Sequence, residues 1–194
     1  MIQLKDKSKT VRVISVILLL SGSMISFVQA LFSRVILNSG VGITDYFFLI
    51  DRLRGSILTA LAAGGILFGN KELASFSQLL NLSFLILVSV LTGLLYAIGW
   101  VFRTSFYKEL LEMVCAVLFL GILLGKGNTV RLCGWVSMAF YFALIALAGL
   151  EHYHGMAFFQ KNTLPPLMGD LIHYLPLAVG TILLAESISQ DRNT

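Results

Sequence analysis

Long runs of apolar residues, separated by short polar stretches, follow one another along nearly the whole chain. A helix needs about 20 predominantly apolar residues to cross a bilayer. By that criterion the pattern predicts about six membrane-spanning helices, approximately at residues 11–32, 53–69, 79–102, 109–125, 132–151 and 170–187. The connections from the second to the fifth run are short, so consecutive helices are expected to be antiparallel neighbours. The pattern therefore predicts an all-α transmembrane bundle, with residues 1–194 forming a single integral membrane domain.

The first apolar run and the stretch that follows it are the least regular parts of the pattern. A basic leader precedes the run, and Val28-Gln29-Ala30 would be an acceptable signal-peptide cleavage site. The run continues past Ala30, which favours a retained first span. Residues 33–54 mix apolar and polar positions and could form an interfacial or a re-entrant element, because irregular backbone inside a bilayer needs protein or water partners. We favour an exposed loop with a short interfacial helix.

Small residues recur at every fourth position in two of the predicted spans. Ser56, Ala60 and Gly64 do so in the second span, and Gly121 and Gly125 in the fourth. Small residues at this spacing let another helix backbone approach closely in a bilayer. We therefore expect these five residues to form helix-packing grooves.

Composition supports the membrane assignment and excludes a separate soluble domain. The chain is 57% hydrophobic and 12% charged, with a mean hydropathy of +0.88, whereas soluble domains carry roughly 25% charged residues. So little polar surface cannot cover a water-soluble particle, and lipid must cover it instead. The net charge of +4 comes from basic residues scattered over the ends of the apolar runs, so no nucleic-acid partner is expected. The expected partner is the lipid bilayer, with other membrane subunits as a further option.

The basic residues also suggest an orientation. Lys and Arg gather in the leader and in connections on the same side of the predicted bundle, with a weaker population on the opposite side. The positive-inside rule then predicts that both termini lie in the cytoplasm, in a plasma membrane or a bacterial inner membrane.

A cluster of polar residues lies where the fifth and sixth predicted spans meet. Glu151 and His154 are three residues apart and share a helix face, and Asp170 and His173 repeat the spacing on the same membrane side. Two carboxylates and two imidazoles that face one another could bind a divalent metal or transfer protons. The alternative is a solvated interface, because polar side chains at span ends reach the headgroup region.

Cys115, inside the fourth predicted span, is a candidate thiol. The end of that span lies on the same side as the polar cluster, and a cysteine activated by a nearby histidine is the basis of thiol catalysis. Glu109 and Glu112, which share a face at the start of the same span, are interpreted as partners of the helix dipole. Glu186 becomes a functional candidate if it is buried, since carboxylates inside a membrane are costly.

These features favour a transporter, or a membrane-embedded subunit of one, for a small solute. The first alternative is a membrane enzyme, or a redox or metal-binding protein, that uses the Glu, His and Asp cluster. The second is a structural or assembly subunit of a membrane complex, whose small-residue grooves pack against a partner. The sequence assigns no catalytic residue, no substrate-binding residue and no cofactor, and leaves open whether the protein is an enzyme.

Overall fold

The computed structural model describes the backbone of residues 2–31, 43–99, 103–158 and 164–192, and the side chains of residues 8–28, 50, 53–99, 106–150 and 171–191. These residues form helices and no strand, which confirms the predicted all-α bundle. The helices are α1 (Ile2–Leu31), α2 (Ile43–Leu67), α3 (Lys71–Ala97), α4 (Arg103–Leu124), α5 (Asn128–Phe158) and α6 (Leu164–Arg192).

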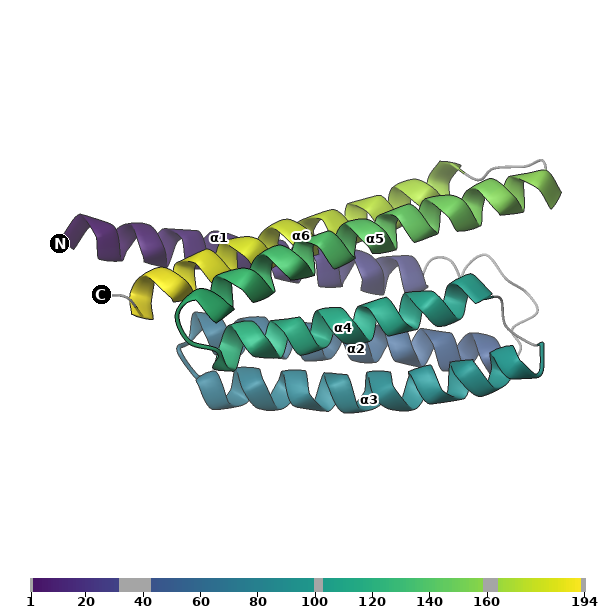
Figure 1. Cartoon of the computed structure of the whole chain (residues 1–194), viewed down its shortest axis with the longest axis horizontal. Helices are drawn as coiled ribbons and strands as arrows, with labels where there is room; N and C mark the ends of the chain where they lie inside the picture. Colours follow the sequence, from purple (N-terminus) through teal and green to yellow (C-terminus); the bar gives the residue numbers. More distant parts are fainter. Residues whose placement is uncertain (1, 32–42, 100–102, 159–163, 193–194) are drawn as a thin grey trace.

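The six helices form a closed ring. Each helix packs against its neighbours in sequence, and α1 also packs against α6, which closes the ring. The helices alternate in direction, so that both termini lie at one end of the bundle, together with the α2–α3 and α4–α5 connections (Figure 1). We call this end the terminal end.

Four of the helices are long and apolar enough to cross a membrane within the described residues. These segments are Ser8–Val28, Lys71–Ala97, Asn128–Leu150 and Leu171–Asp191, and a shorter apolar helix covers Leu53–Leu67. The first half of α4 carries four charged residues, Arg103, Lys108, Glu109 and Glu112, which interrupt its apolar character. The four long helices identify a membrane-embedded protein, whereas membrane crossing by α2 and α4 stays a prediction.

Several helices extend beyond the predicted spans. α2 begins at Ile43, so residues 43–54 belong to a continuous helix, and the exposed loop predicted there is wrong for these residues. Residues 33–42 of that loop lie outside the described part of the chain. α3 begins at Lys71 rather than at residue 79, and its N-terminus is capped by Asn70, whose side-chain oxygen accepts a hydrogen bond from the N–H of Leu73 at 3.0 Å.

The distribution of side chains on α3 is the reverse of that in a soluble protein. The face that packs inside the bundle carries most of the polar residues of the helix, and the opposite face exposes large apolar side chains to the surroundings. Buried polar residues of α3 are Ser77, Gln78, Asn81, Ser89 and Thr92, and exposed apolar residues include Phe76, Leu79, Leu87, Val90 and Leu94. Such a helix suits a lipid environment, where the apolar face needs no further cover.

Several buried hydroxyl groups find partners in their own helices. Ser15 donates to the carbonyl oxygen of Arg12 at 2.7 Å, and Thr181 donates to that of Leu177 at 2.7 Å. Hydroxyls that bond to the preceding helical turn in this way need no solvent. Polar residues therefore occupy the interior here without leaving these donors unsatisfied.

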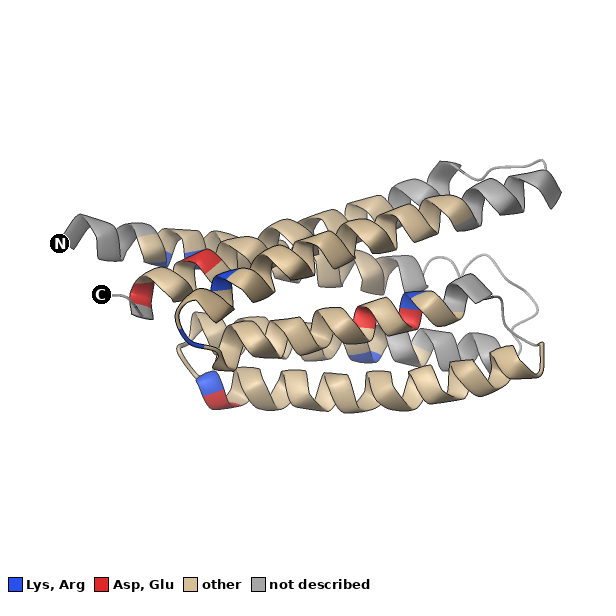
Figure 2. Ribbon diagram, in the orientation of Figure 1, with Lys and Arg blue, Asp and Glu red and all other residues tan. Residues whose placement is uncertain are grey.

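Polar contacts join α1 to α6 near the terminal end. Ser187 Oγ donates to the backbone oxygen of Ser8 at 3.0 Å, Ser8 Oγ donates to Asp191 Oδ1 at 2.5 Å, and Arg12 forms an ion pair with Asp191. Figure 2 shows charged residues gathered at this end and a second group farther along α2 and α4. These contacts join α1 to α6 and so stabilise the closed ring.

Glycines allow α6 to approach both of its neighbours closely. A Cβ atom added to Gly180 would lie 3.0 Å from the backbone oxygen of Ser15 on α1. One added to Gly134 of α5 would lie 2.5 Å from the Cβ of Ala185 on α6, a distance that real Cβ atoms essentially never show. The close packing of α5 and α6 therefore requires glycine at position 134.

Gly134→Ala is expected to lower the free energy of unfolding by about 1–3 kcal/mol, the usual cost of overpacking a well-packed interior. Gly64→Ala is the matched control, because a Cβ at Gly64 meets nothing within 4 Å and alanine favours a helix over glycine by up to about 1 kcal/mol. Unfolding followed by circular dichroism in detergent checks both. Equal stability of the two variants would contradict the close approach of α5 and α6.

Candidate functional site

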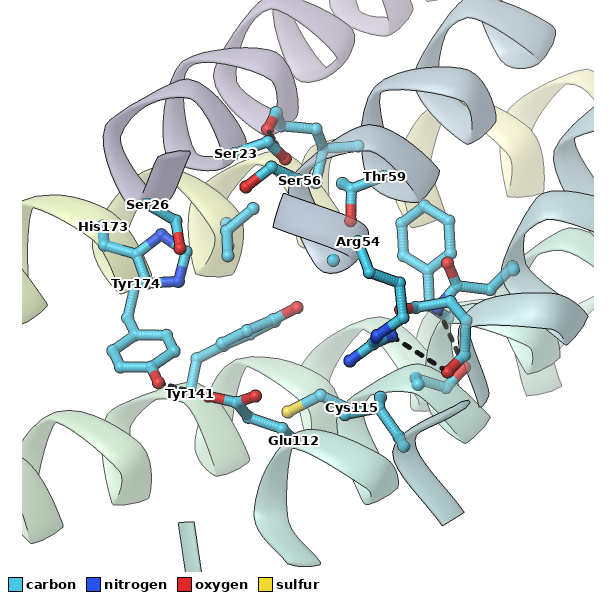
Figure 3. A pocket seen from close by; sticks show the side chains of 18 residues that line it. Ser23, Ser26, Arg54, Ser56, Thr59, Glu112, Cys115, Tyr141, His173 and Tyr174 are labelled. Carbon is cyan, nitrogen blue, oxygen red and sulfur yellow. Dashed lines mark hydrogen bonds between the residues drawn. The ribbon is translucent and has the colours of Figure 1, made fainter. Parts of the chain in front are cut away.

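A cavity of about 110 Å³, with both polar and apolar residues in its lining, lies among the helices, and all six helices contribute to its wall. This volume has room for several water molecules. Hydroxyl and amide groups line it from α1, α2 and α3, and most of its ionisable groups come from α4, α5 and α6 (Figure 3). The neutral polar groups belong to Ser23, Ser26, Ser56, Thr59, Gln78 and Asn81, and the ionisable ones to Arg54, Glu112, Cys115, Tyr141, His173 and Tyr174.

Arg54 reaches the cavity from α2 and is held in position by α3. Its Nη1 donates to the backbone oxygen of Asn81 at 3.3 Å and also to the side-chain oxygen of Asn81. The guanidinium carbon lies 5.6 Å from the centre of the Phe84 ring, within the range of a cation–π interaction. An arginine is always charged in proteins, so these contacts place a permanent positive charge in the wall.

Glu112 provides the opposite charge from α4. It accepts a hydrogen bond at 2.5 Å from the hydroxyl of Tyr174 on α6. Tyr174 is buried, and its ring packs against that of Tyr141 with 6.3 Å between centroids. Hydrogen bonds to ionised acceptors are stronger than those between neutral groups, so this contact both positions the carboxylate and links α4 to α6.

His173 connects the cavity wall to the contact between α1 and α6. Its Nδ1 lies 2.9 Å from the backbone oxygen of Gly22, and because that oxygen only accepts, Nδ1 carries the proton. In a neutral ring Nε2 is then an acceptor. The ring also stacks at a tilt against Tyr174, with 4.5 Å between centroids. His173 is therefore a neighbour of the Glu112–Tyr174 pair within one wall.

Of the polar cluster predicted at the meeting of the fifth and sixth spans, the structure describes one side chain. That residue, His173, lines the central cavity. Glu151 and His154 belong to α5 and Asp170 to α6, but their side chains lie outside the described residues. Among the side chains that are described, no group of three or more His, Cys, Asp or Glu could hold a metal ion. The metal or proton site on these four residues stays a prediction.

Cys115 also lies in the cavity wall. It is 3% exposed and follows Glu112 by one helical turn. Cys133, on α5, is half-buried and faces Gly121 of α4, where an added Cβ would lie 2.7 Å from its Sγ. Both cysteines are free thiols. The reactivity of the Cys115 thiol is thus expected to depend on what occupies the cavity, whereas Cys133 lies in the contact between α4 and α5.

The predicted packing residues have different surroundings. Ser56 is buried in the cavity wall, and Ala60 is half-buried. Gly64 has nothing within 4 Å of an added Cβ. A Cβ at Gly125, which follows the last residue of α4, would meet the backbone oxygen of Gly121 and would lie 3.4 Å from Val130 Cγ2 of α5. Gly121 and Gly125 are thus the two glycines of the set whose added Cβ would meet α5.

Glu186 lies away from the cavity. It forms an ion pair with Arg131 of α5, with 3.2 Å between Arg131 Nε and Glu186 Oε2, and both side chains are partly exposed. Since α5 begins three residues before Arg131, the pair lies near the terminal end. It therefore links α5 to α6 there.

Sequence reasoning did not select Arg54, Asn81, Tyr141 or Tyr174 for the site. One pattern in the sequence of α3 could have indicated the site. Gln78, Asn81, Ser89 and Thr92 recur at helical spacing on one face of an otherwise apolar segment. Polar residues that repeat in this way indicate a face turned toward the interior of a bundle. The tyrosines and Arg54 carry no comparable pattern.

Comparisons of the chain with models of known protein families, with curated proteins and with solved structures give no match. The geometry and chemistry of the cavity are therefore what indicates a function.

Tyr174→Phe is expected to lower the free energy of unfolding by about 1–3 kcal/mol, because it removes the donor to the half-buried carboxylate of Glu112. Tyr96→Phe is the control, since Tyr96 is an exposed residue whose ring stacks on Phe106 and would remain. Denaturant unfolding in detergent compares the two variants. If Tyr174→Phe is as stable as Tyr96→Phe, the Tyr174–Glu112 bond does not join these helices.

Proposed function

We propose that this chain is a membrane-embedded transporter, or the substrate-binding membrane subunit of one, for a small polar solute that occupies the central cavity. The observation that carries the proposal is the cavity among the helices, whose wall is built from all six helices and includes Arg54, Glu112 and His173.

The free-energy cost of placing ionisable residues in the cavity wall supports this function. Ionisable residues inside a membrane are expensive, and they usually face an interior cavity and take part in a substrate or ion pathway. Arg54 and Glu112 both line this cavity. A wall that only held helices together could use apolar residues of similar volume, which are often as stable as a buried pair of charges. A binding role explains why polar groups gather here.

The arrangement of the helices supports transport as well as binding. Substrate sites of transporters typically lie near the middle of the membrane, at an interface between groups of helices that move against each other. Because every helix contributes to this wall, movement of any helix would change the contacts to a bound solute. The small volume favours a solute of few atoms, since pockets for drug-sized ligands are about 300–1,000 Å³.

The orientation proposed is with both termini in the cytoplasm of a plasma or bacterial inner membrane. Most of the described basic residues support it, because Lys9, Arg12, Lys71, Lys126 and Arg131 lie in or next to the segments at the terminal end. Cytoplasmic segments carry the excess of Lys and Arg.

The orientation is tested with two reporters fused to the C-terminus, one that is active only in the cytoplasm and one that is active only outside it. The cytoplasmic reporter should be active. Activity of the periplasmic or extracellular reporter at that position would contradict the orientation.

Solute binding is tested with a cavity-filling variant and a matched control. A panel of small amino acids, carboxylates, amines and polyols is screened by thermal unfolding of the purified protein, and each solute that stabilises it is followed into proteoliposomes. Ser56→Phe is expected to abolish both stabilisation and uptake, because Ser56 is buried in the cavity wall. Ser83→Phe should retain both, since Ser83 is exposed on α3. If no solute stabilises the wild type, or if both variants keep uptake, the proposal fails.

Cys115 provides an independent measure of occupancy. Cys133→Ser leaves Cys115 as the single thiol of the chain. N-ethylmaleimide should then modify Cys115 slowly, because its side chain is buried, and a solute bound in the cavity should slow the reaction further. Cys115→Ser, which leaves Cys133, is the control and should show no protection. Protection of Cys133 without protection of Cys115 would place the solute elsewhere.

A further inference from the structure

A surface pocket of about 450 Å³ lies at the terminal end, between the start of α3 and residues 125–127, which connect α4 to α5. Lys71, Leu124, Lys126 and Gly127 line it, and the first three of these residues are exposed. Figure 2 shows basic residues at both segments. The pocket shares no lining residue with the central cavity, so it is a separate feature of the molecule.

The two lysines of the pocket have no partner of opposite charge in the described part of the chain. Neither Lys71 nor Lys126 forms an ion pair or a side-chain hydrogen bond with any residue described there. Arg12 and Arg131, at the same end, each form an ion pair with a carboxylate of α6. Glu72 follows Lys71 in α3 but is not one of the residues that line the pocket. The pocket therefore presents two ammonium groups to a partner from outside the chain.

Tight turns fix the backbone that carries these lysines. The α2–α3 connection contains Gly69 with a φ of 71°, and the α4–α5 connection contains Gly127 with a φ of 54°, conformations that glycine adopts readily. After the second turn, the N–H of Thr129 donates to the backbone oxygen of Lys126 at 3.2 Å. An ordered backbone on both sides lowers the entropy lost when one ligand binds both lysines.

The pocket lies where helices enter the membrane. The candidate spans Lys71–Ala97 and Asn128–Leu150 begin at its edges, and Leu124, at the end of α4, is 65% exposed in its lining. Basic side chains at such a boundary meet the lipid headgroups, whereas an exposed leucine meets the acyl chains. A phospholipid supplies a partner for both kinds of side chain.

We infer that this pocket binds an anionic phospholipid, whose phosphate accepts hydrogen bonds from Lys71 and Lys126 and whose acyl chains cover Leu124. Hydrogen bonds from an ammonium group to phosphate oxygens are charge-assisted and therefore strong. A zwitterionic phospholipid carries the same phosphate, but the lysines would repel its own cationic group. Because the lipid would contact the start of α3 and the α4–α5 connection together, it would join these helices at the terminal end. The inference does not depend on the proposed transport function.

Competition between two phospholipids tests the inference. Native mass spectrometry in detergent measures how much phosphatidylglycerol and phosphatidylcholine, with the same acyl chains and at equal concentrations, the purified protein retains. The wild type should prefer phosphatidylglycerol by about tenfold or more, and Lys71→Gln or Lys126→Gln should each lower this preference about fivefold, the usual contribution of one lysine near an anionic lipid. Lys9→Gln is the matched control, because Lys9 is exposed at the same end but does not line the pocket. It should leave the preference unchanged.

A second comparison separates a lipid site from a site for a soluble anion. Leu124→Asn should weaken retention of phosphatidylglycerol, and Leu94→Asn, which alters a leucine of similar exposure (61%) outside the pocket, should not. Inorganic phosphate in molar excess should fail to displace the lipid, since it offers no acyl chain to Leu124. Displacement by phosphate would show a soluble-anion site and overturn the inference. Equal retention of the two phospholipids by the wild type, or an equal loss of preference in Lys9→Gln and the two pocket variants, would also overturn it.

Discussion

Hydrogen bonds between helices control the interior of this bundle, because the surrounding lipid offers neither donors nor acceptors. Many of the polar groups that the sequence places inside find a partner within the protein. Hydroxyls such as Ser15 and Thr181 bond to their own helices, whereas larger polar side chains bond to neighbouring helices. Arg54 bonds to α3, Glu112 to α6, and His173 to α1. These interhelical bonds lie around the central cavity, so the same contacts that satisfy the interior also give the candidate site its shape.

Closure of the ring depends on the contact between α1 and α6, and the cavity depends on closure. Near the terminal end the contact consists of the bonds of Ser8 with Ser187 and Asp191. Farther along, an added Cβ at Gly22 would lie 2.8 Å from Leu177 Cγ, which shows how tightly the helices meet there. The bond from His173 to the Gly22 backbone oxygen lies in this close contact. A relative shift of α1 and α6 would therefore move a residue of the cavity wall directly, and that coupling is what a solute-dependent helix movement requires.

The amino-acid pattern was sufficient for the fold class but not for the site. Apolar runs of membrane-spanning length predict helices without knowledge of their partners, and the all-α bundle followed from them. The start of α2 was placed too late because residues 33–54 mix apolar and polar positions, a pattern that was interpreted as an exposed loop with a short interfacial helix. Arg54 is accommodated by Asn81, which lies 27 positions away. Glu112 was assigned to the helix dipole, yet its partner Tyr174 lies 62 positions away. Such pairs depend on how the helices pack, and one sequence contains no record of that packing.

The partners of the two ionisable groups in the cavity wall bear directly on function. Asn81 of α3 bonds to Arg54 of α2, and Tyr174 of α6 bonds to Glu112 of α4. Because each bond joins two different helices, a relative movement of those helices would change the position of the guanidinium or of the carboxylate in the wall. The contacts that a bound solute makes would then differ between two arrangements of the helices, and a ligand shifts such an equilibrium only through a difference of this kind.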